Sequence, residues 1–178
     1  LAAIDADGTP ASDAAAVTFL QAASSSDNTE GNIVVINNAP AVFPLGSTTV
    51  TFSATDSAGN TGNATAIVLV TDQTSPEILV PSAASFPTLD ATGASSNEDL
   101  ISTFLASATA SDNVDSSVTI SNNAPELMPI GSTTVTYTAV DSAGNSVSDS
   151  TIITIADLGA PSVVAPADIT IAATDGSG

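Results

Sequence analysis

The sequence contains no lysine, no arginine and no histidine, against 19 aspartate and glutamate residues, so its formal net charge is −19. A chain without basic side chains cannot replace the counterions of DNA or RNA, which excludes nucleic acid as a direct partner. Attraction to an anionic membrane surface is excluded for the same reason. No apolar run approaches the roughly 20 residues that a spanning helix needs, so we expect no membrane insertion of this segment.

The same absences exclude most enzyme chemistry. Without histidine, lysine, arginine or cysteine there is no base poised near neutrality, no activated serine, no phosphate clamp and no zinc-type site. Paired carboxylates could still act in a glycosidase, so a hydrolase stays as a competing class. We predict a protein that is not an enzyme.

Cysteine is absent, so no disulfide staples the fold and the thiol content says nothing about the compartment. We expect an extracellular, cell-surface location on other grounds, because trypsin-like proteases find no lysine or arginine to cut. An unbalanced negative charge also opposes a compact state unless salt screens it or cations bind to it. Calcium, magnesium or high ionic strength is therefore expected in the native environment.

What the sequence does contain is a repeat with a fixed offset of 85 residues. Asp27-Asn28 returns as Asp112-Asn113, and the hexapeptide at 46–51 returns at 131–136. This period is too long for a solenoid turn and close to the size of one sandwich domain. We expect three parts, namely an Ig-like module lacking its first strand, a complete module, and the first strand of a following module, at residues 1–75, 76–160 and 161–178.

Strand signals dominate each period. Residues 132–141 alternate strictly, with Val135 and Tyr137 on one face, and Ser142-Ala143-Gly144-Asn145 is typical of a hairpin turn. Residues 77–80 form a short β-rich run between prolines, suited to an edge strand. Residues 100–110 are interpreted as a further strand, with a short helix opened at 97–99 as the alternative. Further strands are expected at 114–121, 126–130 and 150–155. About seven short strands per period predict an all-β fold of tandem antiparallel Ig-like β-sandwich modules in a linear array.

The run Pro-Ile-Gly-Ser-Thr-Thr-Val-Thr-Tyr-Thr-Ala-Val-Asp-Ser-Ala-Gly-Asn at 129–145, with its sister run at 44–60, resembles the signature of hyalin (HYR) repeats. These are Ig-like or fibronectin-III-like modules of extracellular adhesive and matrix proteins and of bacterial surface proteins. The resemblance implies a structural or adhesive role without catalysis. Animal members carry paired cysteines and this chain has none, which points to a microbial version.

The acidic loops predict calcium sites where modules meet. In an Ig-like sandwich the B–C loop, the F–G loop and the start of strand A share one pole, so Asp112 with Asn113, Asp141 with Asn145, and the linker residue Asp72 are expected to converge. Carboxylates gathered in one place need a cation or protons, and calcium prefers oxygen ligands. The same reasoning assigns further ligands at the top of the first module and above the next one, namely Asp27, Asp56, Asn60 and Asp157.

Two alternatives to calcium binding stay open. Asp56-Ser57-Ala58-Gly59 is also ordinary type I turn chemistry, and no EF-hand spacing is present. The Asp-x-x-Gly sets at 5–8, 90–93 and 175–178 are interpreted as turns. With calcium at the joints and short proline-ended linkers at 72–76 and 157–161, the modules would form a stiff rod.

The ends of the chain permit two kinds of assembly. Residues 1–4 are in repeat register with 86–89 and 171–174, so the chain is expected to be a window onto, or a processed piece of, a longer protein. The alternative is that subunits join head to tail, each lending residues 161–170 to the open first module of its neighbour by strand addition.

The function expected from these residues is a structural module of a surface filament, stalk or adhesin, with adhesion to a glycan or another surface ligand left to domains outside this segment. The competing function is a carbohydrate-binding module of a secreted protein. Such modules stack sugars on exposed rings, whereas most of the six aromatic residues here fall on inward-facing strand positions.

Overall fold

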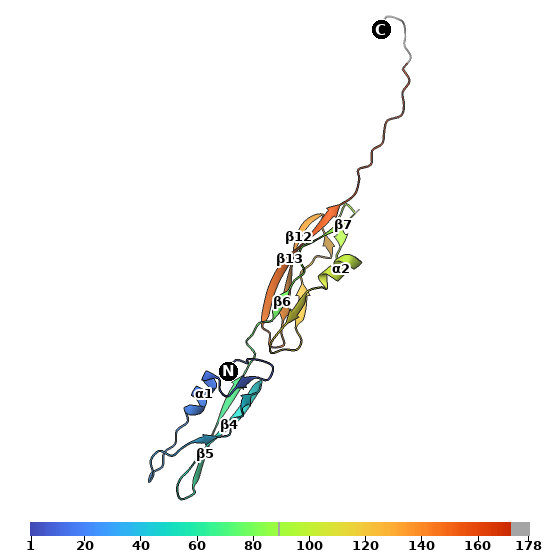
Figure 1. Ribbon diagram of the computed structural model, residues 1–178. Helices are drawn as coiled ribbons and strands as arrows, with labels where there is room; N and C mark the ends of the chain where they lie inside the picture. The colour runs from blue at the N-terminus through green and yellow to red at the C-terminus, as the bar shows by residue number, and fades with distance from the viewer. Residues whose placement is uncertain (89, 172–178) are drawn as a thin grey trace.

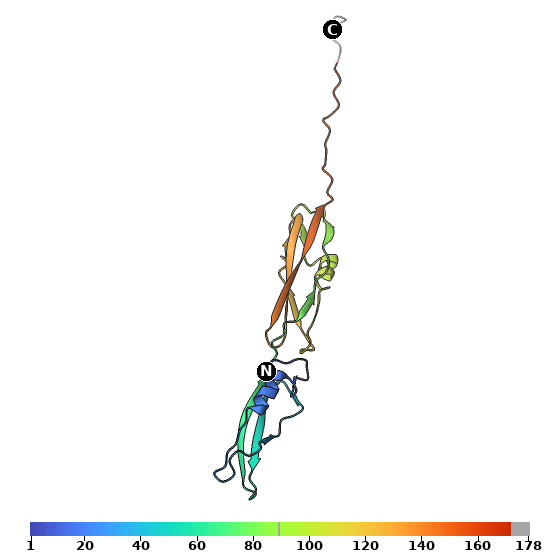
Figure 2. The same cartoon turned by 60° about the vertical axis from the view of Figure 1, so that its left-hand side comes forward.

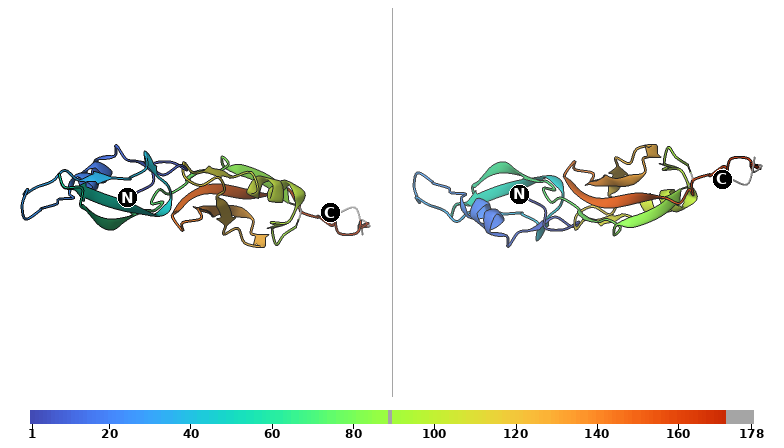
Figure 3. Two further views of the ribbon diagram at one scale, coloured as in Figure 1. Left: turned by 90° about the horizontal axis from the view of Figure 1, so that it is seen from below. Right: turned by 90° about the horizontal axis from the view of Figure 1, so that it is seen from above.

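The computed structural model describes residues 1–88 and 90–171 as two β-rich modules arranged end to end (Figure 1). The arrangement stays elongated when the molecule is turned (Figure 2), and the views from below and above show the two modules next to each other, with their loops meeting at the joint (Figure 3). The N-terminus lies near the joint, and an extended segment leaves the far end of the second module. The two tandem β-rich modules therefore form an elongated array, as the repeat predicted.

The second module contains two layers of strands. The larger sheet has the order β10-β12-β13-β7, and two smaller pairs are β6 with β9 and β8 with β11. All pairs are antiparallel except β13 with β7, which is parallel. Its elements are β6 (Glu77–Leu79), β7 (Ala84–Thr88), β8 (Ala94–Ser95), α2 (Asp99–Leu105), β9 (Thr109–Ser111), β10 (Thr119–Asn122), β11 (Leu127–Met128), β12 (Gly131–Val140) and β13 (Ser146–Asp157).

The first module repeats this plan with fewer pairs. A three-stranded sheet has the order β2-β4-β5, and β1 pairs with β3. Ala2 forms a parallel β-bridge with Thr71, which corresponds to the pairing of Pro87 with Ala156 in the second module. Its elements are β1 (Thr9–Pro10), α1 (Ala14–Gln21), β2 (Ile36–Asn37), β3 (Val42–Phe43), β4 (Gly46–Thr55) and β5 (Thr61–Val70).

The hairpin β12–β13 has the alternation that the sequence predicted. Val135, Tyr137 and Ala139 are fully buried, while the residues between them point outward. Gly144 closes the turn with φ of 92°, a conformation that a residue without Cβ adopts at little cost. The β-branched residues on both faces suit a strand that packs on one side only.

Residues 100–110 are not the strand that we predicted, because most of this segment is helical. α2 occupies it up to Leu105 and the strand β9 begins only at Thr109. Ile101, Phe104 and Leu105 recur at helical spacing and face the core, which favours a helix once the chain must cover the sheet. The short helix that was the alternative is therefore correct. In the first module Asp13 caps α1 by accepting from Ala15 N and Ala16 N at 2.9 and 3.4 Å.

Each module has its own apolar core, in which aromatic rings meet edge to face. Phe19 of α1 packs against Phe52 at 5.8 Å between ring centroids, and Phe104 of α2 packs against Phe86 at 5.6 Å. The two turns at 5–8 and 90–93 carry the expected turn hydrogen bonds, in which Gly8 N donates to Asp5 O at 3.0 Å and Gly93 N donates to Asp90 O at 3.2 Å. The third Asp-x-x-Gly set, at 175–178, lies outside the described residues.

At Tyr137 the cores of the two modules differ in polarity, because its counterpart in the first module is Phe52. The Tyr137 hydroxyl is buried and has no hydrogen-bond partner among the described residues, and burial raises its pKa. A buried hydroxyl without a partner costs about 1–3 kcal/mol.

We therefore predict that Tyr137→Phe stabilises the second module by about 1 kcal/mol, which corresponds to a rise of roughly 4–8 °C in its Tm. Calorimetry of the whole chain measures this directly, and the reverse change Phe52→Tyr is expected to lower the Tm of the first module. A destabilised Tyr137→Phe protein would show that the hydroxyl has a partner in solution.

Candidate metal centre at the module joint

Three carboxylates converge where the linker enters the second module. Asp72 follows β5, Asp115 lies in the loop after β9, and Asp141 follows β12. One oxygen of each lies within 4.8 Å of the others. Since the chain has no lysine, arginine or histidine, no side chain can neutralise this group. Like charges at this distance repel unless a cation or protons join them.

Asp141 is the most buried of the three, with 7% of its surface exposed. Its Oδ1 accepts from Asn145 N at 2.8 Å and its Oδ2 accepts from Asn145 Nδ2 at 2.9 Å. Burial acts to raise the pKa of this carboxyl, but the hydrogen bonds from Asn145 and from the turn backbone outweigh it and hold the pKa below its ordinary value. The fold therefore favours a negatively charged Asp141.

Asp115 and Asp72 complete the group from two other segments. Asp115 accepts from Ser142 N at 2.9 Å and from Ser142 Oγ at 2.7 Å, which connects the loop to the turn after β12. Asp72 Oδ1 accepts from Thr74 N at 2.9 Å, whereas its Oδ2 is buried without a hydrogen-bond partner among the described residues. A buried carboxylate oxygen without a donor is what a bound cation would satisfy.

The other predicted ligands of this joint lie near the three carboxylates but in different roles. Asp112 Oδ1 accepts from Val114 N and Asp115 N, and its Oδ2 is a second buried oxygen without a partner in the described chain. Asn145 directs its amide nitrogen to Asp141 and to the Asp72 carbonyl at 3.5 Å. Asn113 Nδ2 donates across the joint to Ile4 O at 2.7 Å, so it connects the two modules instead of joining the carboxylates.

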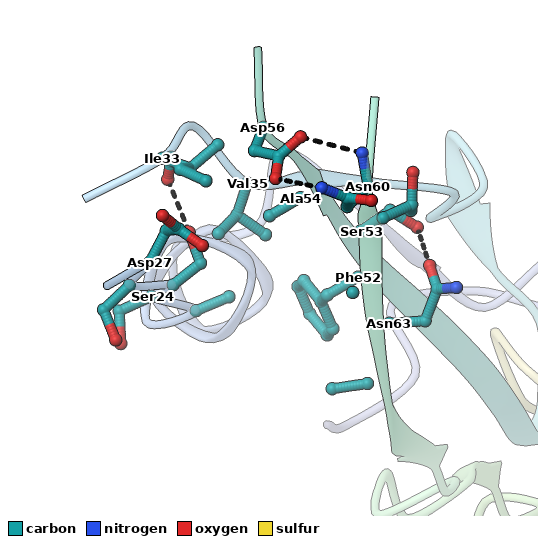
Figure 4. Close-up of a pocket in the computed structure, with 16 residues that line it drawn as sticks. Ser24, Asp27, Ile33, Val35, Phe52, Ser53, Ala54, Asp56, Asn60 and Asn63 are labelled. Atoms are coloured by element: carbon teal, nitrogen blue, oxygen red, sulfur yellow. Dashed lines mark hydrogen bonds between the residues drawn. The ribbon is translucent and has the colours of Figure 1, made fainter. Parts of the chain in front are cut away.

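The first module repeats this arrangement at its pole far from the joint, but with fewer acids together. Asp56 accepts from Asn60 N and Asn60 Nδ2 at 2.7 Å each (Figure 4), and Asp27 accepts from Thr29 and Glu30. Hydrogen bonds from Asn60 lower the pKa of Asp56, and those from Thr29 lower the pKa of Asp27. Within the described ranges, only the joint gathers three carboxylates.

Asp157 stands apart from both groups. It ends β13, is exposed, and its Oδ1 accepts from Gly159 N at 2.7 Å. It is the counterpart of Asp72 one period later. In the described chain its side chain takes part in a turn, and its role as a metal ligand stays a prediction.

Comparison with known proteins identifies the family of these modules. The HYR domain profile matches residues 8–70 and again residues 71–155. The chain belongs to the HYR domain family. A hyalin of Lytechinus variegatus is 35% identical over 121 residues, which are 66% of this chain and 22% of that protein. A hyalin of Strongylocentrotus purpuratus is 30% identical over 147 residues, 80% of this chain and 12% of that protein.

These HYR modules thus correspond to a minor part of the hyalins that they resemble. The human desmocollin-1 ectodomain is a structural neighbour at 14% identity and a TM-score of 0.27, over 76% of this chain and 33% of that one. A TM-score this low carries no argument about the fold, so the fold assignment depends on the strand pairing described above. The family is one of extracellular, adhesion-type modules, not of enzymes. The described residues include no helix long and apolar enough to cross a membrane.

Asp115 is the residue of this HYR joint that sequence reasoning missed. It lies three residues after Asp112, in the loop from which only Asp112 and Asn113 were selected. The signal was available, because its counterpart Glu30 is also acidic. Glu30 contacts Ser57 N and Oγ just as Asp115 contacts Ser142, so the repeat preserves both the charge and its partner.

We predict that the charge of Asp141 gives its full stabilisation to the second HYR module only above the ordinary pKa of 3.8. Because folding lowers this pKa, the stabilisation is complete above that value and is lost as the pH falls through the lower, folded-state pKa. The Tm difference between the native chain and Asp141→Asn, measured with chelator from pH 6 to pH 3, should therefore shrink below about pH 4. A difference that is constant or grows on acidification would contradict the prediction. Asp56→Asn tests the same relation independently in the first module.

Proposed function

We propose that this pair of HYR modules is a stiff structural spacer of an extracellular filament, stalk or adhesin, in which a calcium ion at the joint fixes one module relative to the next. The observation that carries the proposal is that one oxygen of each of Asp72, Asp115 and Asp141 lies within 4.8 Å of the others, and that Asp72 has a buried oxygen with no hydrogen-bond partner among the described residues. A chain of charge −19 has only external cations with which to neutralise such a group.

The chemistry of the donors favours calcium over other metals. Carboxylate oxygens are hard ligands, and the sequence has no histidine or cysteine to attract zinc or copper. The ligands come from three loops of unequal length, a setting that suits the variable geometry of calcium better than the strict octahedron of magnesium. Extracellular modules bind calcium with Kd values of roughly 10⁻⁴ to 10⁻³ M, so partial occupancy tuned by the surroundings is expected.

The joint also has an apolar contact that supports the rod. Val114 comes from the second module, yet it is 6% exposed and packs into the core cluster of the first module with Ala3 and Phe43. The hydrogen bond from Asn113 to Ile4 O flanks this contact. The cation and the valine would act together, because both fix the loop at 112–115 against the end of the first module.

A sugar-binding function has less support. All six aromatic residues lie in the described part of the chain, and none of them is exposed. Stacking of a sugar needs an accessible ring face, so the chain lacks the usual platform. Recognition of a ligand is better assigned to other domains of the protein in which these modules occur.

We predict that millimolar calcium raises the Tm of the chain at fixed ionic strength, and that Asp115→Asn removes most of this rise. A ligand at 100 times its Kd stabilises the folded state by about 2.7 kcal/mol. Differential scanning calorimetry with calcium and with chelator measures the effect, and isothermal titration gives the stoichiometry. Asp72→Asn should behave like Asp115→Asn.

Asp149→Asn is the matched control for charge alone. The side chain of Asp149 is exposed on β13 and accepts a hydrogen bond only from Ser150 N among the described residues. Its replacement therefore removes one negative charge without changing the joint. The control variant should keep the full response to calcium. An equal loss of response in both variants, or no response in the native chain, would overturn the proposed site and leave a flexible acidic spacer.

We predict that Val114→Thr loosens the rod while both modules stay folded. Threonine is the residue that the first module has at this place, Thr29, and it would put a hydroxyl into an apolar contact at a cost of about 1–3 kcal/mol. Small-angle X-ray scattering should show a broader distribution of end-to-end distances. The reverse change Thr29→Val, at the pole far from the joint, should leave the scattering curve of this chain unchanged. An unaltered curve for Val114→Thr would contradict the role of the valine.

A further inference from the structure

One asparagine of the chain stands in an N-glycosylation sequon. Asn63-Ala64-Thr65 has an asparagine, then a residue other than proline, then a threonine, which is the pattern that N-linked glycosylation requires. No other asparagine of the chain has serine or threonine two positions later. The second module has Ser148-Asp149-Ser150 at the same place of the repeat, so the sequon belongs to one module alone.

The fold places the first and third residues of this sequon on the outer face of the hairpin β4–β5. The two strands are antiparallel, with Asn63 opposite Ser53. Side chains alternate along a strand, so Phe52 points into the core while Ser53 and Asn63 point away from it (Figure 4). Asn63 and Thr65 are both exposed. A bulky group attached to Asn63 would therefore extend from the surface and not enter the core.

The reacting atom of Asn63 is accessible. Its Oδ1 accepts from Ser53 Oγ at 2.6 Å, which leaves Nδ2, the atom that carries the sugar, without a hydrogen-bond partner among the described residues. The residues next to it on this face are small, namely Thr61 and Thr65 along β5 and Ser53 across on β4. The counterpart Ser148 in the second module is exposed as well, so the open position is a property of the repeat.

The outer face around this sequon is more apolar than its counterpart. Three apolar side chains point outward from β2 and β5 with more than half of their surface exposed, namely Ile36, Ile67 and Leu69. The second module has only one apolar residue at the equivalent places, which are Ser121, Ile152 and Thr154. Exposed apolar surface promotes association, and a glycan is bulky and solubilising. The sequon therefore stands in the module whose outer face has more apolar surface to cover.

We propose that Asn63 is the acceptor of one N-linked oligosaccharide, which covers part of the outer face of the first module. In the transfer a bond forms between Asn63 Nδ2 and the anomeric carbon of the first sugar, while the bond from that carbon to the pyrophosphate of a lipid-linked oligosaccharide donor breaks. Nδ2 loses one proton and the lipid pyrophosphate leaves. The HYR family is extracellular, and sequons are used in secreted proteins. The proposal does not depend on calcium, because the hairpin turn near Asn63 lies at the pole far from the joint.

Secretion of the whole chain, fused to a cleavable signal peptide, from a eukaryotic cell that attaches N-linked glycans tests the acceptor. We expect the chain to carry one oligosaccharide, which peptide N-glycosidase releases with conversion of Asn63 to aspartate. Tandem mass spectrometry locates this change after digestion at aspartate and glutamate, since the chain has no lysine or arginine for trypsin. A native chain without glycan, secreted beside a glycoprotein that the same cells do modify, would overturn the proposal. A glycan on a different asparagine would overturn it too.

Variants of the sequon test the assignment residue by residue. Asn63→Gln and Thr65→Ala should each abolish the glycan, whereas Thr65→Ser should keep it because serine retains the hydroxyl. Ser148→Asn is the matched gain, since it completes a sequon with Asp149 and Ser150 at the same exposed place of the second module and should add a second glycan. A glycan that persists in Asn63→Gln would contradict the assignment, as would a native chain that stays unmodified while the Ser148→Asn chain gains a glycan.

The Tm tests whether the folded module holds the glycan on its outer face. Because Asn63 points to solvent, the glycosylated chain and the same chain after glycan release should differ in Tm by less than about 4 °C. A glycosylated chain that is unfolded, when the released chain is folded, would overturn the proposal. The response to calcium should be the same in both forms, and its absence from both would contradict the calcium proposal alone.

Discussion

The absence of any internal positive side chain is the constraint on which the rest of this structure depends. Every carboxylate must be stabilised by N–H and O–H donors, by solvent or by an external cation. The loops meet this demand locally, since Asp27, Asp112 and Asp141 each accept at least two hydrogen bonds from their own turn. At the joint, where two loops and the linker converge, the local donors do not reach every oxygen. The negative charge of the carboxylate oxygens that lack a donor there is the physical basis of the metal hypothesis.

The strands could be predicted from the sequence because their signal is local. Alternation with period two fixes which face of β12 is buried, and Gly144 in a four-residue turn fixes the hairpin. The sequence predicted α2 only as the alternative to a strand. The serine and threonine residues between its apolar residues fit the period of a strand as well as the period of a helix. Tertiary packing decided the outcome, since Ile101 and Phe104 reach the core only from a helix.

The group of carboxylates at the joint was predictable in position but not in composition. Topology correctly places Asp72 and Asp141 at one pole, because strand order determines which loops are neighbours. It does not specify which acid of a loop points inward, and here Asp112 serves the backbone of its own loop while Asp115 joins the group. Val114 could not be predicted at all, because its partners are about a hundred residues earlier in the sequence and the equivalent residue of the first module is threonine.

The two poles show what the joint adds to the repeated loops. Both modules carry the Asp-Asn turn, at Asp56 and Asn60 in the first and at Asp141 and Asn145 in the second. Each also has a second acid that accepts from the serine after that aspartate, since Glu30 accepts from Ser57 and Asp115 accepts from Ser142. Among the described residues, only the linker brings a third carboxylate, Asp72, to such a pair. The joint therefore combines two acids of one module with one acid that follows the last strand of the other, so a cation bound to all three would hold the two modules together.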